Sequence, residues 1–530
     1  MALVSRRRLS LSLQRNATVV SQQKLKDWVA RLNTIRDDYV ATEWEIILLE
    51  AFSTLGAVEH EPVENGHIDV VFRAKDGRVS FAADITAISD WSLHRKNPID
   101  TFTEELRRQI RKRNLGRFGG FSYSVSEKCQ HGILSRGRHR SALLPHVSSF
   151  RETIFNDKWD EFVSMIRANP TIQHTYHASL PASELKISFV VNLKGHITGS
   201  FGGYTGANVL TDNPLYNSLH KKAHELKRSR YLGPIGIIVC DGGCGMLTAP
   251  PTWNAYTVRD VVTEFFRQHR SIHFVTIISI KSNPSLHSPM KTSYTYISTT
   301  YSRSDAATDI SSISEIIDQA VKRLPAVKRS PENVIYDLRW DRPKGPYRPY
   351  LGGWSYTQSS LTISAREFLE VISGKMLHAI FKKNHEMANG SNSFISRIAL
   401  SQQITGISLF HQDDEDDDVV SLKFGLREDA NAPSDKGVAR QMSDRTISVR
   451  AKELLYLLAG TIGIEEFNQS LEDSNFFAAR FAVGELFSDL TFQKEPCAHN
   501  DRIIFSFGPP DPAIAPFCVP AVPDIGLNFS

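Results

Sequence analysis

Two aspartates could bind a metal ion from neighbouring strands. The segment 67–73 alternates between apolar and polar residues and places Asp69 on the face opposite its larger apolar side chains. The segment 78–88 does the same for Asp84, and Asp76-Gly77 between the two predicts a hairpin turn. A buried carboxylate without a partner is unfavourable by several kcal/mol. Because Mg²⁺ binds one or two carboxylates together with water and phosphate oxygens, it is a suitable partner for this pair.

The helix that precedes these strands offers a third carboxylate. Glu45 is followed at helical spacing by Leu48, Leu49 and Phe52, which indicates that it lies on an inward face. Glu43 lies on another side of the same helix, and we expect it at the rim. Glu45 is therefore our third predicted metal ligand.

A helix-borne Glu45, then Asp69, a hairpin, and Asp84 in Phe81-Ala-Ala-Asp-Ile-Thr-Ala resembles the PD-(D/E)xK nuclease superfamily, which includes restriction endonucleases. The resemblance covers the segment around these residues, or the whole of 40–300 if the later elements complete the core. It implies an α/β fold with a restriction-endonuclease-like mixed sheet flanked by helices. It also implies hydrolysis of DNA phosphodiester bonds with Mg²⁺ or Mn²⁺, and a role in restricting foreign DNA as an antiviral defence.

The sequence departs from this pattern at Thr86, which stands where the family has a lysine. A hydroxyl is neither a cation nor a base at neutral pH. One explanation is that a basic side chain from elsewhere replaces the lysine, and the candidates are Arg95, Lys96, Arg108 and Lys112. We assign the catalytic roles to Asp69, Asp84, Thr86 and Lys96. The other explanation is that catalysis is lost and the protein is an inactive nucleic-acid-binding or scaffold protein.

A third hypothesis concerns Asp241, which ends an apolar strand and precedes two glycines. Strand ends of α/β sheets often border a binding site. An enzyme acting on a small phosphorylated ligand near Asp241 would follow from this placement.

The distribution of basic residues favours a polyanionic partner for the first part of the chain. Residues 1–300 hold 38 Lys and Arg against 27 Asp and Glu, whereas 301–530 hold 24 against 31. This asymmetry favours contact of the first part with nucleic acid, expected to be DNA. The predicted contact residues are Arg107, Arg108, Arg111, Lys112, Arg136, Arg138, Lys221 and Lys222.

The pattern of elements predicts a chain of several parts. We expect a basic tail and leading helix at 1–40 and a nuclease-like domain at 41–305 with inserted loops at about 114–185. A helix and Pro-rich linker follow at 306–350, and a mixed α+β domain at 351–530. The first 26 residues contain no acid, which suggests a mobile tail or, as an alternative, a transit peptide. The acidic run 413–418 reads as a solvated loop.

Composition restricts the cellular setting. Five scattered cysteines do not make a disulfide scaffold and fit a reducing compartment, so we expect a cytoplasmic protein. No apolar run is long enough to span a membrane, and no membrane partner is expected. The acidic C-terminal domain could mediate a homo-oligomer or bind a partner protein. The sequence Thr362-Ile-Ser-Ala-Arg-Glu is weakly repeated at 446–453, where it reads Thr-Ile-Ser-Val-Arg-Ala-Lys-Glu.

Overall fold

A computed structural model describes the chain as two compact units, each with mixed helices and strands. One unit is Met1–Glu50, Leu324–Arg329 and Asn333–Ser530, and the other is Ala51–Arg323 and Ser330–Glu332. The described residues are 3–520 except 35–37, 63–67, 91–97, 128–143, 182, 192–195, 201–208, 230, 249–255, 285–291, 304–309, 332–333, 335–354, 358, 377, 379–380, 382–392, 413–414, 427–439, 470, 472–474, 496–499 and 514. Within these ranges, no helix combines the length and apolar character that crossing a bilayer requires.

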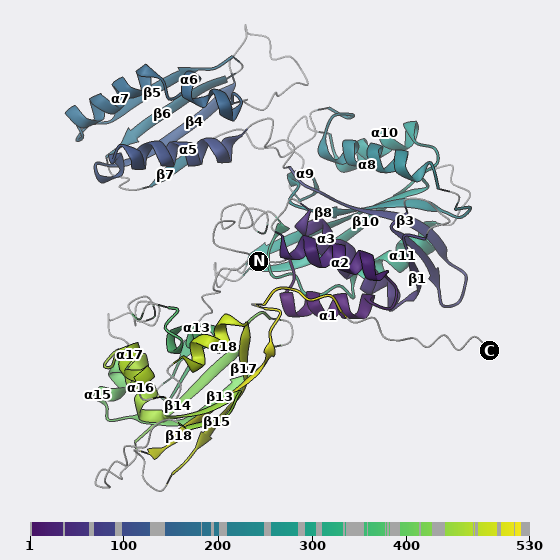
Figure 1. Cartoon of the computed structure of the whole chain (residues 1–530). Coiled ribbons are helices and arrows are strands. Elements are labelled where there is room, and N and C mark those ends of the chain that lie inside the picture. Colours follow the sequence, from purple (N-terminus) through teal and green to yellow (C-terminus); the bar gives the residue numbers. More distant parts are fainter. Residues whose placement is uncertain are drawn as a thin grey trace. The chain divides into compact units, whose positions relative to one another are not determined.

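A six-stranded mixed sheet forms the centre of the unit that contains the two aspartates (Figure 1). Its strands, in spatial order, are β1 (Gly56–His60), β2 (Val70–Ala74), β3 (Ser80–Ile88), β8 (Ile235–Asp241), β9 (Phe274–Pro284) and β10 (Thr292–Ser302). The strands β1, β2 and β3 are antiparallel, β3, β8 and β9 are parallel, and β10 returns antiparallel. All seven residues of β8 are buried, as expected for a parallel strand covered on both faces.

The predicted hairpin is present. Gly77 has φ of 70°, a left-handed conformation that glycine adopts without steric strain, and Phe72 pairs with Phe81 across the strands. One face of β3 packs aromatic rings together: Phe81 lies 5.2 Å from Phe72 and 5.9 Å from Phe52 between ring centroids. The other face carries Asp84, so the alternation predicted for this strand is confirmed.

Helices α8 (Pro214–Leu226) and α10 (Val258–Gln268) share a hydrophobic core with the second face of the sheet. Asn213 caps α8 by accepting a hydrogen bond from the Tyr216 backbone, and Pro214 occupies its first turn, where a missing N–H is tolerated. The remaining helices of this part are α9 (Gly245–Thr248) and α11 (Ile310–Val321).

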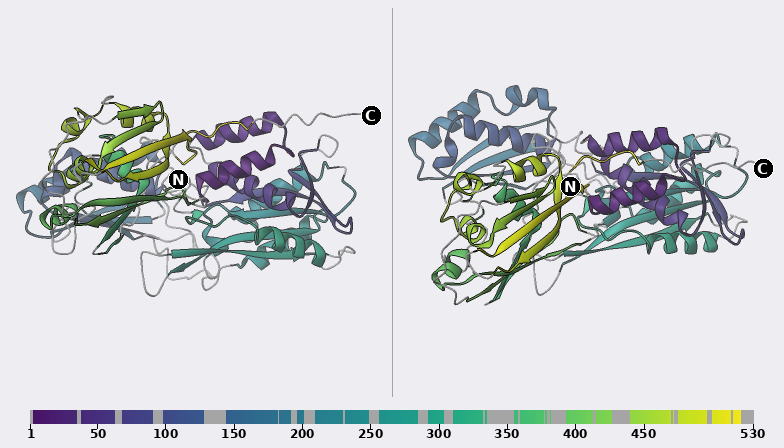
Figure 2. Two further views of the ribbon diagram at one scale, coloured as in Figure 1. Left: turned by 90° about the horizontal axis from the view of Figure 1, so that it is seen from below. Right: turned by 60° about the horizontal axis from the view of Figure 1, so that its bottom comes forward.

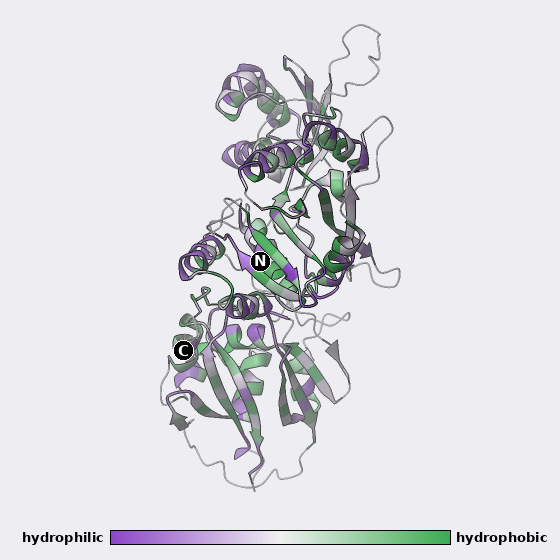
Figure 3. Ribbon diagram, turned by 90° about the vertical axis from the view of Figure 1, so that its right-hand side faces the viewer, coloured by the Kyte–Doolittle hydropathy of each residue, from purple (hydrophilic) through white to green (hydrophobic). Residues whose placement is uncertain are grey.

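A second, four-stranded sheet replaces the loops predicted at 114–185, so that prediction is wrong for the described residues of this segment. Its order is β5 (His174–Ser179), β6 (Ser183–Val190), β4 (Gly120–Glu127) and β7 (Ile197–Ser200). Its helices are α5 (Ile99–Lys112), η2 (Leu115–Arg117), η3 (Val147–Ser149), α6 (Phe150–Thr153) and α7 (Asp157–Ala168). Both α5 and α7 contribute to a hydrophobic core with this sheet. Figure 3 shows helices that are green on one side and purple on the other, a pattern typical of helices packed on one face.

The C-terminal part is α+β, as predicted, and contains a structural repeat. One antiparallel sheet has the order β11 (Ser355–Tyr356), β12 (Ser360–Ser364), β14 (Val419–Gly425) and β13 (Gln403–Phe410). The other has the same connectivity: β15 (Arg440–Ser443), β16 (Thr446–Arg450), β18 (Arg502–Pro510) and β17 (Glu485–Gln493). Their helices are α13 (Ala365–Ile372), α15 (Ser393–Ala399), α16 (Ala451–Ala459), α17 (Ile464–Gln469) and α18 (Phe476–Ala482). Figures 1 and 2 show these helices beside the strands.

The two similar sequence phrases occupy equivalent places in this repeat. Each ends a second strand and begins the following helix, α13 or α16. In both halves the first helical N–H donates to the residue before the fourth strand: Ala365 to Asp418 at 2.8 Å and Ala451 to Asp501 at 2.9 Å. Both halves contribute to one hydrophobic core. The weak sequence repeat therefore corresponds to a repeated fold.

The N-terminal residues are packed helices and group with the C-terminal part, contrary to the prediction of a mobile tail. The helices are α1 (Arg6–Asn16), α2 (Gln22–Asn33) and α3 (Tyr39–Ser53). Arg7 on α1 donates to both carboxylate oxygens of Asp418, at 2.7 and 2.9 Å. Asp416 accepts from the backbone of Arg6 at 2.6 Å. The described part of the acidic run is therefore an anchor for α1 rather than a solvated loop.

Candidate metal and phosphate site

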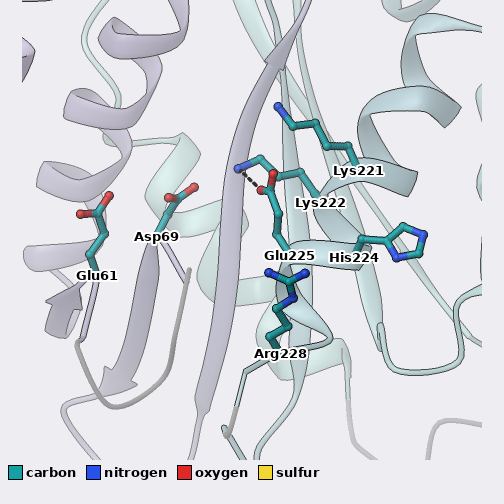
Figure 4. A pocket seen from close by; sticks show the side chains of 7 residues that line it. All are labelled: Glu61, Asp69, Lys221, Lys222, His224, Glu225 and Arg228. Carbon is teal, nitrogen blue, oxygen red and sulfur yellow. Dashed lines mark ion pairs between the residues drawn. The ribbon is translucent and has the colours of Figure 1, made fainter.

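A pocket of about 760 Å³ opens where the carboxylates of the six-stranded sheet meet α8 (Figure 4). Acidic and basic side chains both line it: Glu61, Asp69, Lys221, Lys222, His224, Glu225 and Arg228. Asp69 comes directly before β2, and the last five residues belong to α8 or follow it. The sequence prediction of Asp69 as a site residue and of Lys221 and Lys222 as basic contacts therefore converges on one place.

Lys222 supplies an ammonium group to Asp84. Its Nζ donates to Asp84 Oδ1 at 2.8 Å and also lies 3.1 Å from Glu225 Oε2. The Asp84 side chain is 0% exposed, whereas that of Lys222 is 21% exposed. The ion pair thus connects a buried carboxylate of β3 with the pocket that Lys222 lines.

The negative charge of Asp69 also acts on the ammonium group of Lys222. Its Oδ2 accepts a hydrogen bond from the backbone N–H of Ile85 at 2.8 Å, which fixes the carboxylate beside β3. Burial alone would lower the pKa of Lys222, but the charges of Asp69 and Asp84 and the hydrogen bond to Asp84 raise it well above its ordinary value. Lys222 is therefore a cation throughout the physiological range.

Thr86 faces α8, the helix that carries Lys222. Thr86 Oγ1 lies 3.2 Å from Ser218 Oγ on α8. Ser218 is one helical turn before Lys222, while Thr86 is two residues after Asp84 on the same strand face. Because α8 runs along β3 with Ser218 beside Thr86 and Lys222 beside Asp84, the ammonium comes from the helix rather than from position 86.

Asp84, Asp69 and Glu61 offer oxygen donors in or beside the pocket, although in the described part of the chain their carboxylates do not all lie within 4.8 Å of one another. Asp84 Oδ2 is buried and has no hydrogen-bond partner among the described residues. Asp69 and Glu61 add carboxylates in the pocket wall, and oxygen donors of this kind are what Mg²⁺ and Mn²⁺ bind. Glu61 has φ of 45°, a conformation that non-glycine residues rarely adopt and that is often retained at functional sites.

On α3 the prediction that Glu45 faces inward and Glu43 lies at the rim is wrong, because the two positions are exchanged. Glu43 is fully buried and accepts from the Leu3 backbone at 2.9 Å, and burial raises its pKa to about 8. Glu45 is partly exposed, with its Oε1 3.0 Å from Lys24 Nζ and its Oε2 accepting from Trp28 at 3.0 Å. Glu45 and Asp69 belong to different compact units, so the metal-binding role of Glu45 stays a prediction.

The other predicted basic residues do not strengthen the site. Lys96 and Arg95, and also Arg136 and Arg138, lie outside the described residues. On α5, Arg107 pairs with Glu104 and Arg108 with Glu105, which neutralises two of the charges proposed to contact phosphate. Arg111 and Lys112 are exposed on the same helix, and their contact with nucleic acid stays a prediction.

Asp241 has a structural role. Its Oδ1 accepts from the backbone N–H groups of Gly243 and Cys244, at 2.9 and 3.3 Å, and the carboxylate is 1% exposed. These bonds close the turn after β8. The hypothesis of a phosphorylated ligand at Asp241 receives no support from this geometry.

Sequence reasoning missed Glu61, His224 and Glu225 as pocket residues. It assigned Lys222 only to nucleic-acid contact. One signal was present in α8: Ser218, Lys222 and Glu225 follow one another at spacings of four and three, so polar residues share one side of an otherwise apolar inner face. That side faces β3 in the structure.

Comparison with protein-family models, with curated proteins and with solved structures finds no match. Functional inference for this chain therefore depends on its own residues and their geometry.

Proposed function

We propose that this protein is a metal-dependent nuclease that hydrolyses phosphodiester bonds in DNA, with a divergent restriction-endonuclease-like core. The observation that carries the proposal is the 2.8 Å contact between Lys222 Nζ and Asp84 Oδ1. It supplies the cation that Thr86 cannot, beside the two aspartates of the resemblance. The chain order of helix, strand, hairpin and second Asp-bearing strand also agrees with that resemblance. A role in restricting foreign DNA would follow from the resemblance by analogy.

In this mechanism Asp69 and Asp84 would hold Mg²⁺ or Mn²⁺, and Glu61 in the pocket wall would be the third carboxylate. The bound ion would polarise a phosphoryl oxygen and increase the acidity of a coordinated water. Asp84 would offer its Oδ2, which has no hydrogen-bond partner among the described residues, while its Oδ1 stays paired with Lys222. Because Lys222 stays protonated, its role is to attract and orient a phosphoryl oxygen or the attacking water, not to accept a proton.

The rim of the pocket is suited to the flanking phosphates. Lys221 and Arg228 line it from the exposed side of α8 and from the residues after it. Two cations at the rim would neutralise phosphates of a bound strand, and such binding weakens steeply with added salt. We assign positioning of the nucleic acid to Lys221 and Arg228 and the chemistry to Asp69, Asp84 and Lys222.

Cleavage of supercoiled plasmid and of a labelled RNA, each with Mg²⁺, Mn²⁺ or EDTA, tests the proposal. We expect metal-dependent cleavage of DNA by the parent protein and its loss in Asp84→Ala and Asp69→Asn. Asp76→Asn, in the exposed hairpin turn, is a matched control and should cleave normally. Circular dichroism verifies that each variant is folded. Equal cleavage by Asp84→Ala and the parent would remove the proposal.

The second candidate is an inactive nuclease-like protein that binds nucleic acid. It is favoured by the burial of Asp84, whose side chain is 0% exposed and already paired with Lys222. Calorimetry separates the two functions: the inactive protein binds DNA equally with and without Mg²⁺ and releases no cleavage product. The nuclease binds the metal, and this binding is lost in Asp69→Asn.

A further inference from the structure

Three histidines form a hydrogen-bonded cluster between α8 and α10, apart from the carboxylates of the pocket. His220 Nδ1 lies 2.9 Å from His269 Nε2, and His220 Nε2 lies 3.1 Å from His224 Nε2. His220 and His224 are four residues apart on α8 and therefore project from the same side of the helix. His224 lines the pocket, but its ring points away from Asp69 in Figure 4.

The rings are held in place by aromatic packing. Tyr216 stacks on His220 with 5.9 Å between centroids and an interplanar angle of 17°. Phe265 stacks on His269 at 4.7 Å and 24°. His220 and His224 are nevertheless exposed to solvent, so an ion can reach them. Fixed orientation combined with access is what a preformed ligand set requires.

We propose that His220 Nε2 and His224 Nε2 chelate a borderline transition-metal ion such as Zn²⁺, Ni²⁺ or Cu²⁺, with His269 as the residue that orients His220. Two nitrogens bound to one ion at about 2.0–2.1 Å lie about 2.9–3.4 Å apart for angles between right and tetrahedral. The observed 3.1 Å separation falls within this range. Water molecules complete the coordination, and imidazole donors exclude Mg²⁺ as the preferred ion.

His269 supports this site through its position. Its Nε2 lies 2.9 Å from His220 Nδ1, where it can accept the Nδ1–H of His220. That bond places the proton of His220 on Nδ1 and leaves the Nε2 lone pair for the ion, as in other sites where a second group fixes the tautomer of a ligating histidine.

Calorimetric titration of the full chain with Zn²⁺ tests the site, independently of nuclease activity. We expect one ion per chain, at least tenfold weaker binding in His220→Ala and His224→Ala, and weakening of about 10–100-fold in His269→Ala. His177→Ala, at an exposed histidine on β5, should bind as the parent does, and Asp84→Asn is measured beside it to detect Zn²⁺ held by the carboxylate pocket instead. With Cu²⁺, electron paramagnetic resonance should show coupling to two imidazole nitrogens, reduced in either ligand variant.

Two results would overturn the assignment. One is no heat of Zn²⁺ binding by the parent at a tenfold excess of ion. The other is equal affinity of His220→Ala, His224→Ala and His177→Ala, which would place the bound ion elsewhere. If Asp84→Asn alone loses Zn²⁺, the ion belongs to the carboxylate pocket and the histidine site is refuted, while the proposed nuclease function is unaffected.

Discussion

Replacing Lys222 by methionine should destabilise the protein strongly, because it leaves the buried Asp84 without its only side-chain partner among the described residues. Methionine keeps most of the side-chain length and removes the charge. The two charged atoms are 2.8 Å apart, so their attraction is about 6 kcal/mol at an effective dielectric constant of about 20. Removing one member of a buried pair typically destabilises by about 3–5 kcal/mol, and we expect a loss in this range at pH 7.

Lys221→Met is the matched control, since Lys221 is the exposed neighbour on the same helix. Its effect should stay within about 0.5 kcal/mol. Urea-induced unfolding followed by circular dichroism measures both variants. The double variant Asp84→Asn/Lys222→Met should recover most of the loss, because it also removes the buried charge that Lys222 balances. Added Mg²⁺ should stabilise Lys222→Met more than Lys221→Met. Equal stability of the two single variants would refute the reasoning.

Three further predictions concern the same contacts and the N-terminal helices. Lys222→Met should lose DNA cleavage, and the double variant Thr86→Lys/Lys222→Met should recover part of it, because position 86 faces α8 next to Asp84. If a plasmid assay shows no recovery, a lysine at position 86 cannot take the place of Lys222. The parent protein should lose up to about 1.4 kcal/mol of stability per pH unit as pH rises from the ordinary carboxyl pKa toward about 8, because of Glu43. Glu43→Gln should abolish this pH dependence. The reason is that the native state retains a proton that the unfolded state releases, and urea titrations at pH 5 and pH 8 measure the difference. Arg7→Met should destabilise the N-terminal helices, detected by faster amide hydrogen exchange in α1, since it breaks two hydrogen bonds to Asp418; unchanged exchange would contradict this.

The hairpin and the face of Asp84 could be predicted from sequence because both follow from local rules. Alternation in 78–88 and the Asp76-Gly77 turn depend only on neighbours in the chain. The role of Lys222 could not be predicted in this way, because it lies 138 residues after Asp84. Its position depends on which strand α8 packs against, and no local pattern contains that information.

The errors on α3 and at the N-terminus have physical causes. Helical spacing distinguishes an inner from an outer face only when one side meets water. Almost the whole of α3 is buried, so the spacing around Glu43 and Glu45 carried no such distinction. Likewise, Arg7 and the acidic run were each read as solvated because sequence alone does not show that they pair, 411 residues apart.

The repeated C-terminal fold has the organisation of a homodimer joined into one polypeptide. Each half supplies a β-β-α motif and two further strands in the same order, and both halves contribute to one hydrophobic core. A fragment ending within 427–439 would separate the two copies and expose apolar residues that normally cover each other. Expression of one copy alone should therefore yield either an insoluble chain or a dimer that rebuilds the missing half.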